Sequence, residues 1–210
     1  MINYKFKTKP YQHQKEIWEK SWFEPYYALF AEMGTGKSKI AIDTIGALYL
    51  EGKIDTSLIL APKGVFDNWV KGEFPTHLPE DIEYKIIRWQ PNWTKKYTEQ
   101  IKEVAIREDS KALHILVMNI EALSTDKGAA SAKRFLERNP NNLTLIDEST
   151  TIKNRKAQRT KTVLELTRLS KFRRILTGSP ITKSPMDLYS QCAFLDTNAL
   201  GFKSFYAFQG

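Results

Sequence analysis

The fold class of this chain is decided by the stretch Ala31-Glu32-Met33-Gly34-Thr35-Gly36-Lys37-Ser38. It follows the apolar run Tyr26–Ala31 and opens a stretch of helical periodicity, so the pattern predicts a strand, a tight glycine loop and a helix in that order. This is the pattern of a phosphate-binding P-loop, with Ala31 at the position of the usual first glycine. The alternative is a chance Gly-Lys-Ser turn at a helix start, and the flanking strand and helix argue against it.

Each residue type in this loop has a physical task. Gly34 and Gly36 let the backbone turn so that successive N–H groups converge on phosphate oxygens at a helix N-terminus. Lys37 is placed to reach the β- and γ-phosphates, and the Ser38 hydroxyl is placed to ligate Mg²⁺. We therefore expect the nucleotide to contact Met33, Gly34, Thr35, Gly36, Lys37 and Ser38. The loop alone predicts a bound nucleotide and does not say what is done with it.

Six apolar runs of strand length alternate with longer stretches of helical periodicity. The runs are Tyr26–Ala31, Ser57–Ala61, Tyr84–Trp89, His114–Asn119, Leu143–Ile146 and Arg174–Thr177. Most are near-continuous, as expected for strands that are buried on both faces of a parallel sheet. The alternation predicts an α/β fold, with a mostly parallel central sheet and helices on both of its faces. We expect residues 1–210 to form one domain.

Two carboxylates, Asp147 and Glu148, end the apolar run Leu143–Ile146. They are expected at the carboxyl edge of the sheet, where ligands of open α/β folds bind. Asp147 would hold Mg²⁺, directly or through water, and Glu148 would polarise an attacking water molecule. Such a pair is also common as a turn or a helix cap. The P-loop upstream favours the catalytic interpretation, with Lys37, Asp147 and Glu148 as the catalytic residues.

The net charge of +8 is concentrated in one segment. Residues 151–174 hold nine of the 32 Lys and Arg residues and one of the 24 Asp and Glu residues, so the rest of the chain is neutral overall. A basic stripe of this kind can be the footprint of a polyanion partner. It can equally be the solvated face of a helix. Charge alone does not decide between these two interpretations.

The number of cysteines and the hydropathy of the chain indicate in which cellular compartment the protein is found. The single cysteine, Cys192, cannot form an internal disulfide, and we interpret it as a small packed side chain. No apolar run approaches the length of about 20 residues that a membrane-spanning helix needs. We therefore expect an intracellular protein that does not associate with a membrane. Its usage of lysine, isoleucine and asparagine favours a phage or bacterial source.

Further motifs stand in a characteristic order around the P-loop and the acidic pair. They are Lys9-Pro10-Tyr11-Gln12, Ala61-Pro62-Lys63 with Asn68-Trp69, Met118-Asn119-Ile120-Glu121-Ala122-Leu123, Asp147-Glu148-Ser149-Thr150, Ile152-Lys153-Asn154 and Leu176-Thr177-Gly178-Ser179-Pro180-Ile181. This order resembles the first RecA-like lobe of superfamily 2 helicases, most closely the Swi/Snf-type translocases of double-stranded DNA. The resemblance covers nearly the whole chain and implies a RecA-like P-loop NTPase fold that uses ATP and Mg²⁺.

The resemblance also assigns roles to single residues. Gln12 would read the adenine edge; the alternative is an exposed polar residue on an N-terminal helix. Lys63, Asn119 and Lys153 would lie along the nucleic-acid backbone. Phe66 and Trp69 fit better as core residues of the next helix than as platforms for bases.

Thr177 and Ser179 resemble the element that couples the nucleotide state to movement between lobes. The alternative is a simple pair of hydroxyls at a strand end, which Gly178 and Pro180 make plausible. The family usually has Ala-His after the acidic pair, whereas this chain has Ser149-Thr150. Coupling in this protein is therefore expected to use different contacts.

The resemblance implies a DNA-dependent ATPase or helicase whose ATP site is completed by arginines of a second RecA-like lobe. That lobe is expected beyond Gly210 or on another chain, so the present lobe alone should hydrolyse little ATP. Two alternatives stay open: a nucleotide-dependent nucleic-acid-binding module without hydrolysis of its own, and a lobe of an RNA helicase. A small-molecule kinase or GTPase is disfavoured, because no Asn-Lys-x-Asp guanine signature occurs.

Overall fold

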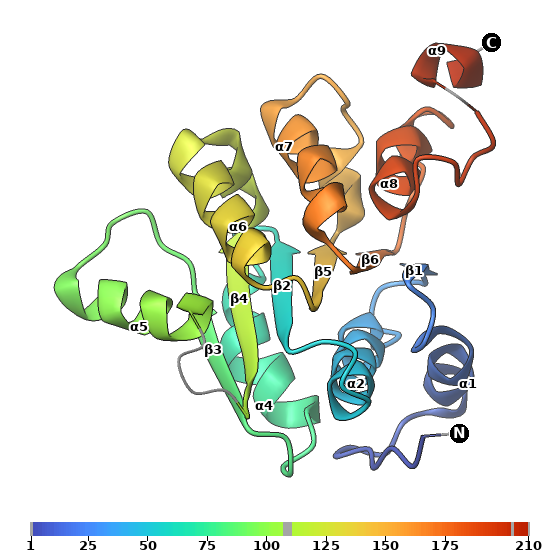
Figure 1. Cartoon of the computed structure of the whole chain (residues 1–210). Coiled ribbons are helices and arrows are strands. Elements are labelled where there is room, and N and C mark those ends of the chain that lie inside the picture. The colour runs from blue at the N-terminus through green and yellow to red at the C-terminus, as the bar shows by residue number, and fades with distance from the viewer. Residues whose placement is uncertain (1, 107–110, 203, 210) are drawn as a thin grey trace.

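The computed structural model describes residues 2–106, 111–202 and 204–209, which form one six-stranded sheet with surrounding helices (Figure 1). The strands are β1 (Tyr26–Phe30), β2 (Thr56–Ala61), β3 (Tyr84–Arg88), β4 (Leu113–Asn119), β5 (Asn142–Asp147) and β6 (Phe172–Thr177). Their order is β1-β6-β5-β2-β4-β3, and every neighbouring pair is parallel. All six predicted strands are confirmed, with bounds within two residues of those predicted.

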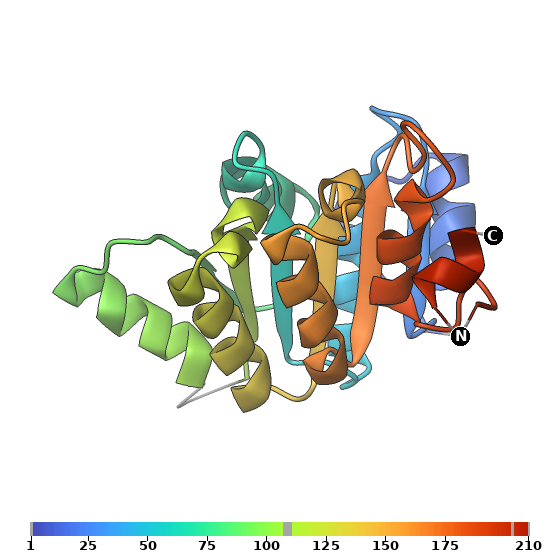
Figure 2. The same cartoon turned by 90° about the horizontal axis from the view of Figure 1, so that it is seen from above.

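Helices cover both faces of the sheet. The described helices are α1 (Gln12–Ser21), α2 (Lys37–Leu50), α3 (Phe66–Asn68), α4 (Phe74–His77), α5 (Lys95–Ile106), α6 (Asp126–Arg138), α7 (Gln158–Leu166), α8 (Asp187–Leu195) and α9 (Phe205–Gln209). Helices α1, α2 and α4 lie on one face, and α5 to α8 lie on the other (Figure 2). This confirms the predicted three-layer α/β class. Within the described ranges, none of these helices combines the length and apolar character that crossing a bilayer requires.

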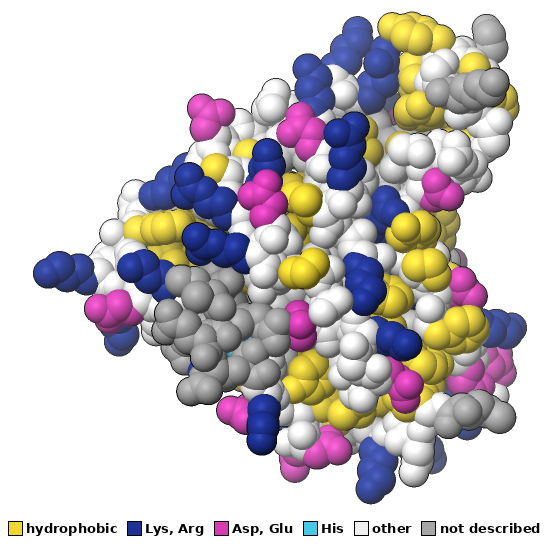
Figure 3. Space-filling model, viewed as in Figure 1, with side chains coloured by type: hydrophobic (Ala, Val, Ile, Leu, Met, Phe, Trp, Pro, Cys, Tyr) yellow, Lys and Arg dark blue, Asp and Glu magenta, His cyan; other side chains and the backbone are white. Residues whose placement is uncertain are grey.

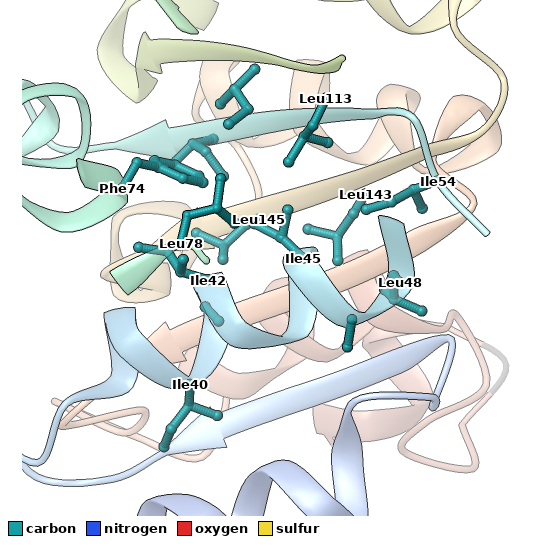
Figure 4. Packing of buried hydrophobic residues seen from close by; sticks show 14 of the residues in the cluster. Ile40, Ile42, Ile45, Leu48, Ile54, Phe74, Leu78, Leu113, Leu143 and Leu145 are labelled. Atoms are coloured by element: carbon teal, nitrogen blue, oxygen red, sulfur yellow. The ribbon is translucent and has the colours of Figure 1, made fainter. Parts of the chain in front are cut away.

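The alternation of side chains along the strands divides the core into two halves. On β2, Ile59 and Ala61 join the cluster under α2, whereas Leu58 and Leu60 join the cluster on the opposite face. Successive strand residues point to opposite faces, so a strand covered on both sides must be apolar at nearly every position. Figure 4 shows the first half, in which α2 packs its apolar side chains against those of β5.

Parallel pairing brings the carboxyl ends of all six strands to one edge of the sheet. The P-loop follows β1, and the segment 177–181 follows β6 beside it. The acidic pair stands at the end of β5, the next strand in the order. The strand order therefore places the three nucleotide motifs on three adjacent strands, although they are far apart in the sequence.

Two arginines of the basic segment 151–174 are internal. Arg173 and Arg174 lie on β6 and are buried. The Arg174 guanidinium donates hydrogen bonds to four backbone carbonyls of residues 21–25, at distances between 2.6 and 3.3 Å. Burial lowers the pKa of Arg174 to about 10, so it stays charged at neutral pH. Arg174 therefore attaches the end of α1 to β6 and is not free to bind a polyanion.

Other basic residues of this segment also have partners within the chain. The Arg155 guanidinium lies 4.2 Å from the ring centroid of Phe205, and Arg159 Nε donates to the Thr151 carbonyl at 2.8 Å. The exposed basic side chains of the segment include Lys156, Lys161 and Arg168. On the face seen in Figure 3, Lys and Arg side chains are interspersed with Asp and Glu side chains. The segment is thus not one continuous basic stripe.

Candidate nucleotide site

The P-loop has the backbone geometry that the sequence predicts. β1 ends at Phe30 and α2 begins at Lys37, and between them Gly34 and Gly36 have φ values of 77° and 82°. This left-handed region favours glycine, because a Cβ would be strained there. Gly36 is the N-cap of α2, and in the described structure no side chain caps that helix start. The first N–H groups of α2 are therefore available to an anion.

Lys37 lies within the curve of this loop. It is 9% exposed, and its Nζ donates to the backbone carbonyls of Ala31 at 2.8 Å and of Glu32 at 2.9 Å. Ser38 follows it in the first turn of α2 and is half-buried. The ammonium group is thus held close to the loop backbone, where a phosphate would lie against the loop.

Both carboxylate oxygens of Asp147 accept hydrogen bonds. Trp69 Nε1 donates to Oδ2 at 2.9 Å, and the Glu148 backbone N–H donates to Oδ1 at 3.0 Å. Burial raises the pKa of Asp147 above its ordinary value, while the bond from Trp69 and the positive charge of Lys37 act in the opposite direction. Lys37 therefore lies close enough to Asp147 for its charge to act on that carboxylate.

Trp69 is one residue of this site whose contact with the acidic pair sequence reasoning missed. The prediction that it belongs to the core is confirmed, since it is 1% exposed, and Phe66 is half-buried. The bond to Asp147 joins residues 78 positions apart, so no local pattern reveals it. Trp69 begins a π-helical turn, Trp69–Glu73, and single π-helical turns are frequent at functional sites.

Glu148 has an unusual backbone conformation and a side-chain partner at the end of β6. Among the described non-glycine residues it alone has a positive φ, 49°, a conformation that costs on the order of 1–3 kcal/mol. Its Oε2 accepts a hydrogen bond from Thr177 Oγ1 at 3.2 Å, and Thr177 Oγ1 accepts one from the Ser179 N–H at 3.2 Å. The structure therefore brings Glu148, Thr177 and Ser179 together.

The start of α1 packs against the P-loop. Gln14 is 5% exposed and its Nε2 donates to the Thr35 carbonyl at 2.9 Å; a Cβ at Gly36 would lie only 2.2 Å from that nitrogen. Gln12 is exposed, and its Nε2 donates to Glu16 Oε1 at 2.7 Å. The side chain of the proposed adenine reader is thus hydrogen-bonded within its own helix, and its role stays a prediction. Gln14 was missed because its burial depends on the position of α1.

The residues present fit a nucleoside triphosphate with Mg²⁺. The loop offers backbone N–H groups and the Lys37 ammonium, while Ser38 and Asp147 offer oxygen ligands. Among the described residues, no group of three or more His, Cys, Asp or Glu side chains could form an all-protein metal site. Mg²⁺ is usually held by one or two protein ligands together with phosphate oxygens and water, so this small ligand set suits it.

The candidate nucleic-acid residues fall into two places. Ala61 on β2 pairs with Asn119 on β4, so the exposed Lys63 and the half-buried Asn119 stand at neighbouring strand ends. Asn119 Oδ1 accepts a hydrogen bond from the Glu121 N–H at 2.7 Å, which is a cap of the following turn. Lys153 lies elsewhere, with its Nζ donating to Thr182 Oγ1 in the segment after β6.

Replacing Trp69 by Phe should weaken Mg²⁺-dependent ATP binding about tenfold, the lower end of the range for removal of a group that orients a metal ligand. The indole N–H is lost, so Asp147 Oδ2 is no longer held. Calorimetry of ATP binding with and without Mg²⁺ measures the effect.

The matched control is Trp89→Phe, because Trp89 is 6% exposed and its Nε1 has no hydrogen-bond partner within the described ranges. Both variants remove the same volume from the core. An equal loss of Mg²⁺-dependent affinity in both would contradict the assignment to Trp69.

Comparison with known proteins relates this geometry to a family. The chain is 32% identical over 170 residues to the probable ATP-dependent DNA helicase CHR12 of Arabidopsis thaliana. This alignment covers 78% of the present chain and 14% of CHR12. The chain is 28% identical over 180 residues to the helicase-like transcription factor of Homo sapiens, covering 80% of this chain and 16% of that protein. The chain therefore spans less than a fifth of the length of these relatives.

A solved structure and a protein family also match this chain. The Sulfolobus solfataricus SWI2/SNF2 ATPase core in complex with dsDNA has a similar fold, with a TM-score of 0.74 and 22% identity, over 100% of this chain and 40% of that one. The family described as the SNF2-related domain matches residues 27–209. Because this match covers most of the chain and includes the P-loop, the acidic pair and the segment after β6, the chain belongs to the SNF2-related domain family.

Proposed function

We propose that this chain is the ATP-binding lobe of an ATP-dependent DNA translocase or helicase of the Swi/Snf type, which couples ATP hydrolysis to movement along duplex DNA. The observation that carries the proposal is the convergence of the P-loop, the acidic pair and the Thr177–Ser179 segment on the adjacent strands β1, β5 and β6. The name of one relative, a probable ATP-dependent DNA helicase, supports it.

The residues divide the chemical work as follows. The P-loop N–H groups and Lys37 bind the phosphates and neutralise charge on the γ-phosphate. Ser38 and Asp147 hold Mg²⁺, which supplies Lewis-acid polarisation of the phosphoryl oxygens when bound. Glu148 orients the attacking water and accepts its proton. Thr177 and Ser179, bonded to Glu148, respond to the state of the nucleotide, and Gln12 selects adenine.

The partner in this proposal is a nucleic-acid backbone. Lys63 and Asn119, at the ends of β2 and β4, offer a cation and an amide to phosphates, and Lys153 offers a second cation. Backbone contacts of this kind position the duplex without reading its sequence. The solved structure with a similar fold is a complex with dsDNA, which favours duplex DNA over RNA.

A second RecA-like lobe, in the same chain or another, would complete the site with arginines.

We also infer an intracellular setting, because Cys192 is the only cysteine and reduced thiols are typical of that environment. A phage or bacterial source stays a prediction from composition. The competing function is a nucleotide-dependent nucleic-acid-binding module that does not hydrolyse ATP.

The full-length protein should hydrolyse ATP faster when duplex DNA is present, and Lys37→Ala should abolish this stimulation. Lys37 bonds the loop backbone and is not part of either hydrophobic cluster, so the variant should keep its melting temperature while calorimetry shows much weaker ATP binding. A steady-state ATPase assay with and without duplex DNA tests the function. ATP and DNA binding without turnover in the parent would favour the competing module, and unchanged ATP affinity in Lys37→Ala would contradict the site.

A further inference from the structure

A buried amide joins the turn after the acidic pair to the segment after β6. Ser149 Oγ donates a hydrogen bond to Gln191 Oε1 at 2.6 Å. Gln191 Nε2 donates to the Pro180 carbonyl at 2.7 Å and to the Asp187 carbonyl at 2.7 Å. Ser149 and Gln191 are both 0% exposed. The side chain of Gln191, on α8, therefore connects two loops that are separated by a strand and a helix.

The hydrogen bonds fix the orientation of this amide. A glutamine side chain buried without partners is costly, because its two N–H groups and its carbonyl oxygen lose their bonds to water. Here both N–H groups meet backbone carbonyls and the oxygen meets a hydroxyl. A flipped amide would set its oxygen against those carbonyls. The Gln191 amide is therefore held in one orientation. A hydrocarbon side chain of similar size could not form these hydrogen bonds.

This connection runs beside a second one between the same two segments. Thr177 Oγ1 donates to Glu148 Oε2 at 3.2 Å, and the Ser179 N–H donates to Thr177 Oγ1. Residues 148 and 149 are thus joined to residues 177–180 at two points, a partly buried bond from Thr177 to Glu148 and a fully buried one through Gln191 of α8. A shift of the segment 177–180 that keeps these hydrogen bonds would therefore also move the backbone that carries Glu148.

The backbone at Glu148 needs such support. Its positive φ is unfavourable for a side chain with a Cβ and persists only when the surroundings hold it. On one side Asp147 is held by Trp69, and on the other side Ser149 is held by Gln191. These two side-chain bonds therefore hold the backbone on either side of Glu148.

We propose that Ser149 and Gln191 are positioning residues, which aim the Glu148 carboxylate and transmit movement of the segment 177–180 to it. The inference rests on the proposed function, because it assigns Glu148 to the water that attacks ATP. The Ser149-Thr150 dipeptide led us to expect coupling contacts that differ from those of the family. The hydrogen bond between Ser149 and Gln191, 42 positions apart, would be such a contact.

The test uses the full-length protein with Ser149→Ala, Gln191→Leu and the double variant. Each should lower the DNA-stimulated turnover number about tenfold, the rate equivalent of one lost hydrogen bond, with the KM for ATP changed less than about twofold. The matched control is Ser190→Ala. Ser190 is the neighbouring residue on α8, is 0% exposed, and its hydroxyl has no hydrogen-bond partner in the described part of the chain. Its turnover should equal that of the parent.

The double variant separates positioning from stability. Ser149→Ala alone leaves Gln191 Oε1 without its donor, so the single variants should also lower the melting temperature. In the double variant an apolar pair fills the same space, so the melting temperature should recover while turnover stays low. Recovery of turnover together with stability would show a purely structural role and overturn the inference. Parent-like turnover in Gln191→Leu would overturn it too, whereas a parent without DNA-stimulated turnover would overturn the proposed function and the inference with it.

Discussion

Glu148→Gln in the full-length protein should lower DNA-stimulated ATP turnover by about 10²–10⁴, the usual contribution of a general base, and leave ATP affinity unchanged. Glutamine has the shape of glutamate, and its side-chain oxygen can still accept the hydrogen bond from Thr177 Oγ1. What it loses is the ability to take a proton from water. A steady-state ATPase assay measures the turnover, and calorimetry of ATP with Mg²⁺ measures the affinity.

Asp147→Asn is the contrasting variant. Both Asp147 oxygens accept from N–H groups, so an amide nitrogen in either position would face the donor of Trp69 or of the Glu148 backbone. We expect this variant to weaken Mg²⁺-dependent ATP binding. An equal loss of affinity in Glu148→Gln and Asp147→Asn would count against the division of roles between the two carboxylates.

The second large effect concerns the lobe by itself. Residues 1–210, expressed alone, should hydrolyse ATP more slowly than the proposed two-lobe protein by roughly 10³–10⁵, the contribution of an arginine supplied across an interface. Among the described residues, no arginine donates a hydrogen bond to the P-loop or to the acidic pair. Arg173 and Arg174 are buried in β6, and Arg155 lies against Phe205.

The measurement is DNA-stimulated turnover of the isolated lobe beside that of the full-length protein, at equal concentrations. The lobe with Lys37→Ala provides the background, since any contaminating ATPase would remain in it. Robust stimulated hydrolysis by the isolated lobe, in proportion to its concentration, would falsify the two-lobe account.

Local patterns in the chain were sufficient to predict the strands, the P-loop and the acidic pair. Strands buried on both faces need apolar side chains at nearly every position, so β2, β4 and β5 stand out as near-continuous apolar runs. Gly34 and Gly36 are required by the positive φ of the loop. These features depend on neighbours within a few positions, and one sequence displays them directly.

The basic segment shows where local reasoning fails. Counting charges places Arg173 and Arg174 with Lys156 and Lys161, yet the first two are buried in β6 and the last two are exposed. An arginine can be buried when backbone carbonyls accept its N–H groups, as the carbonyls at the end of α1 do for Arg174. Whether such carbonyls are available depends on which elements meet, and charge composition carries no information about that.

The sequence by itself determined the class of fold, the carboxyl-edge position of the motifs and the chemical type of each candidate group. Tertiary structure alone decided which of these groups touch. The Trp69–Asp147 bond and the Ser149–Gln191 bond each join residues more than 40 positions apart. Both exist because the strand order sets β5 between β2 and β6, so that the turn after β5 meets the π-helical turn that follows β2 and the helix α8 that follows β6. Side-chain periodicity determines which face of an element is buried, but the packing of whole elements determines its neighbours.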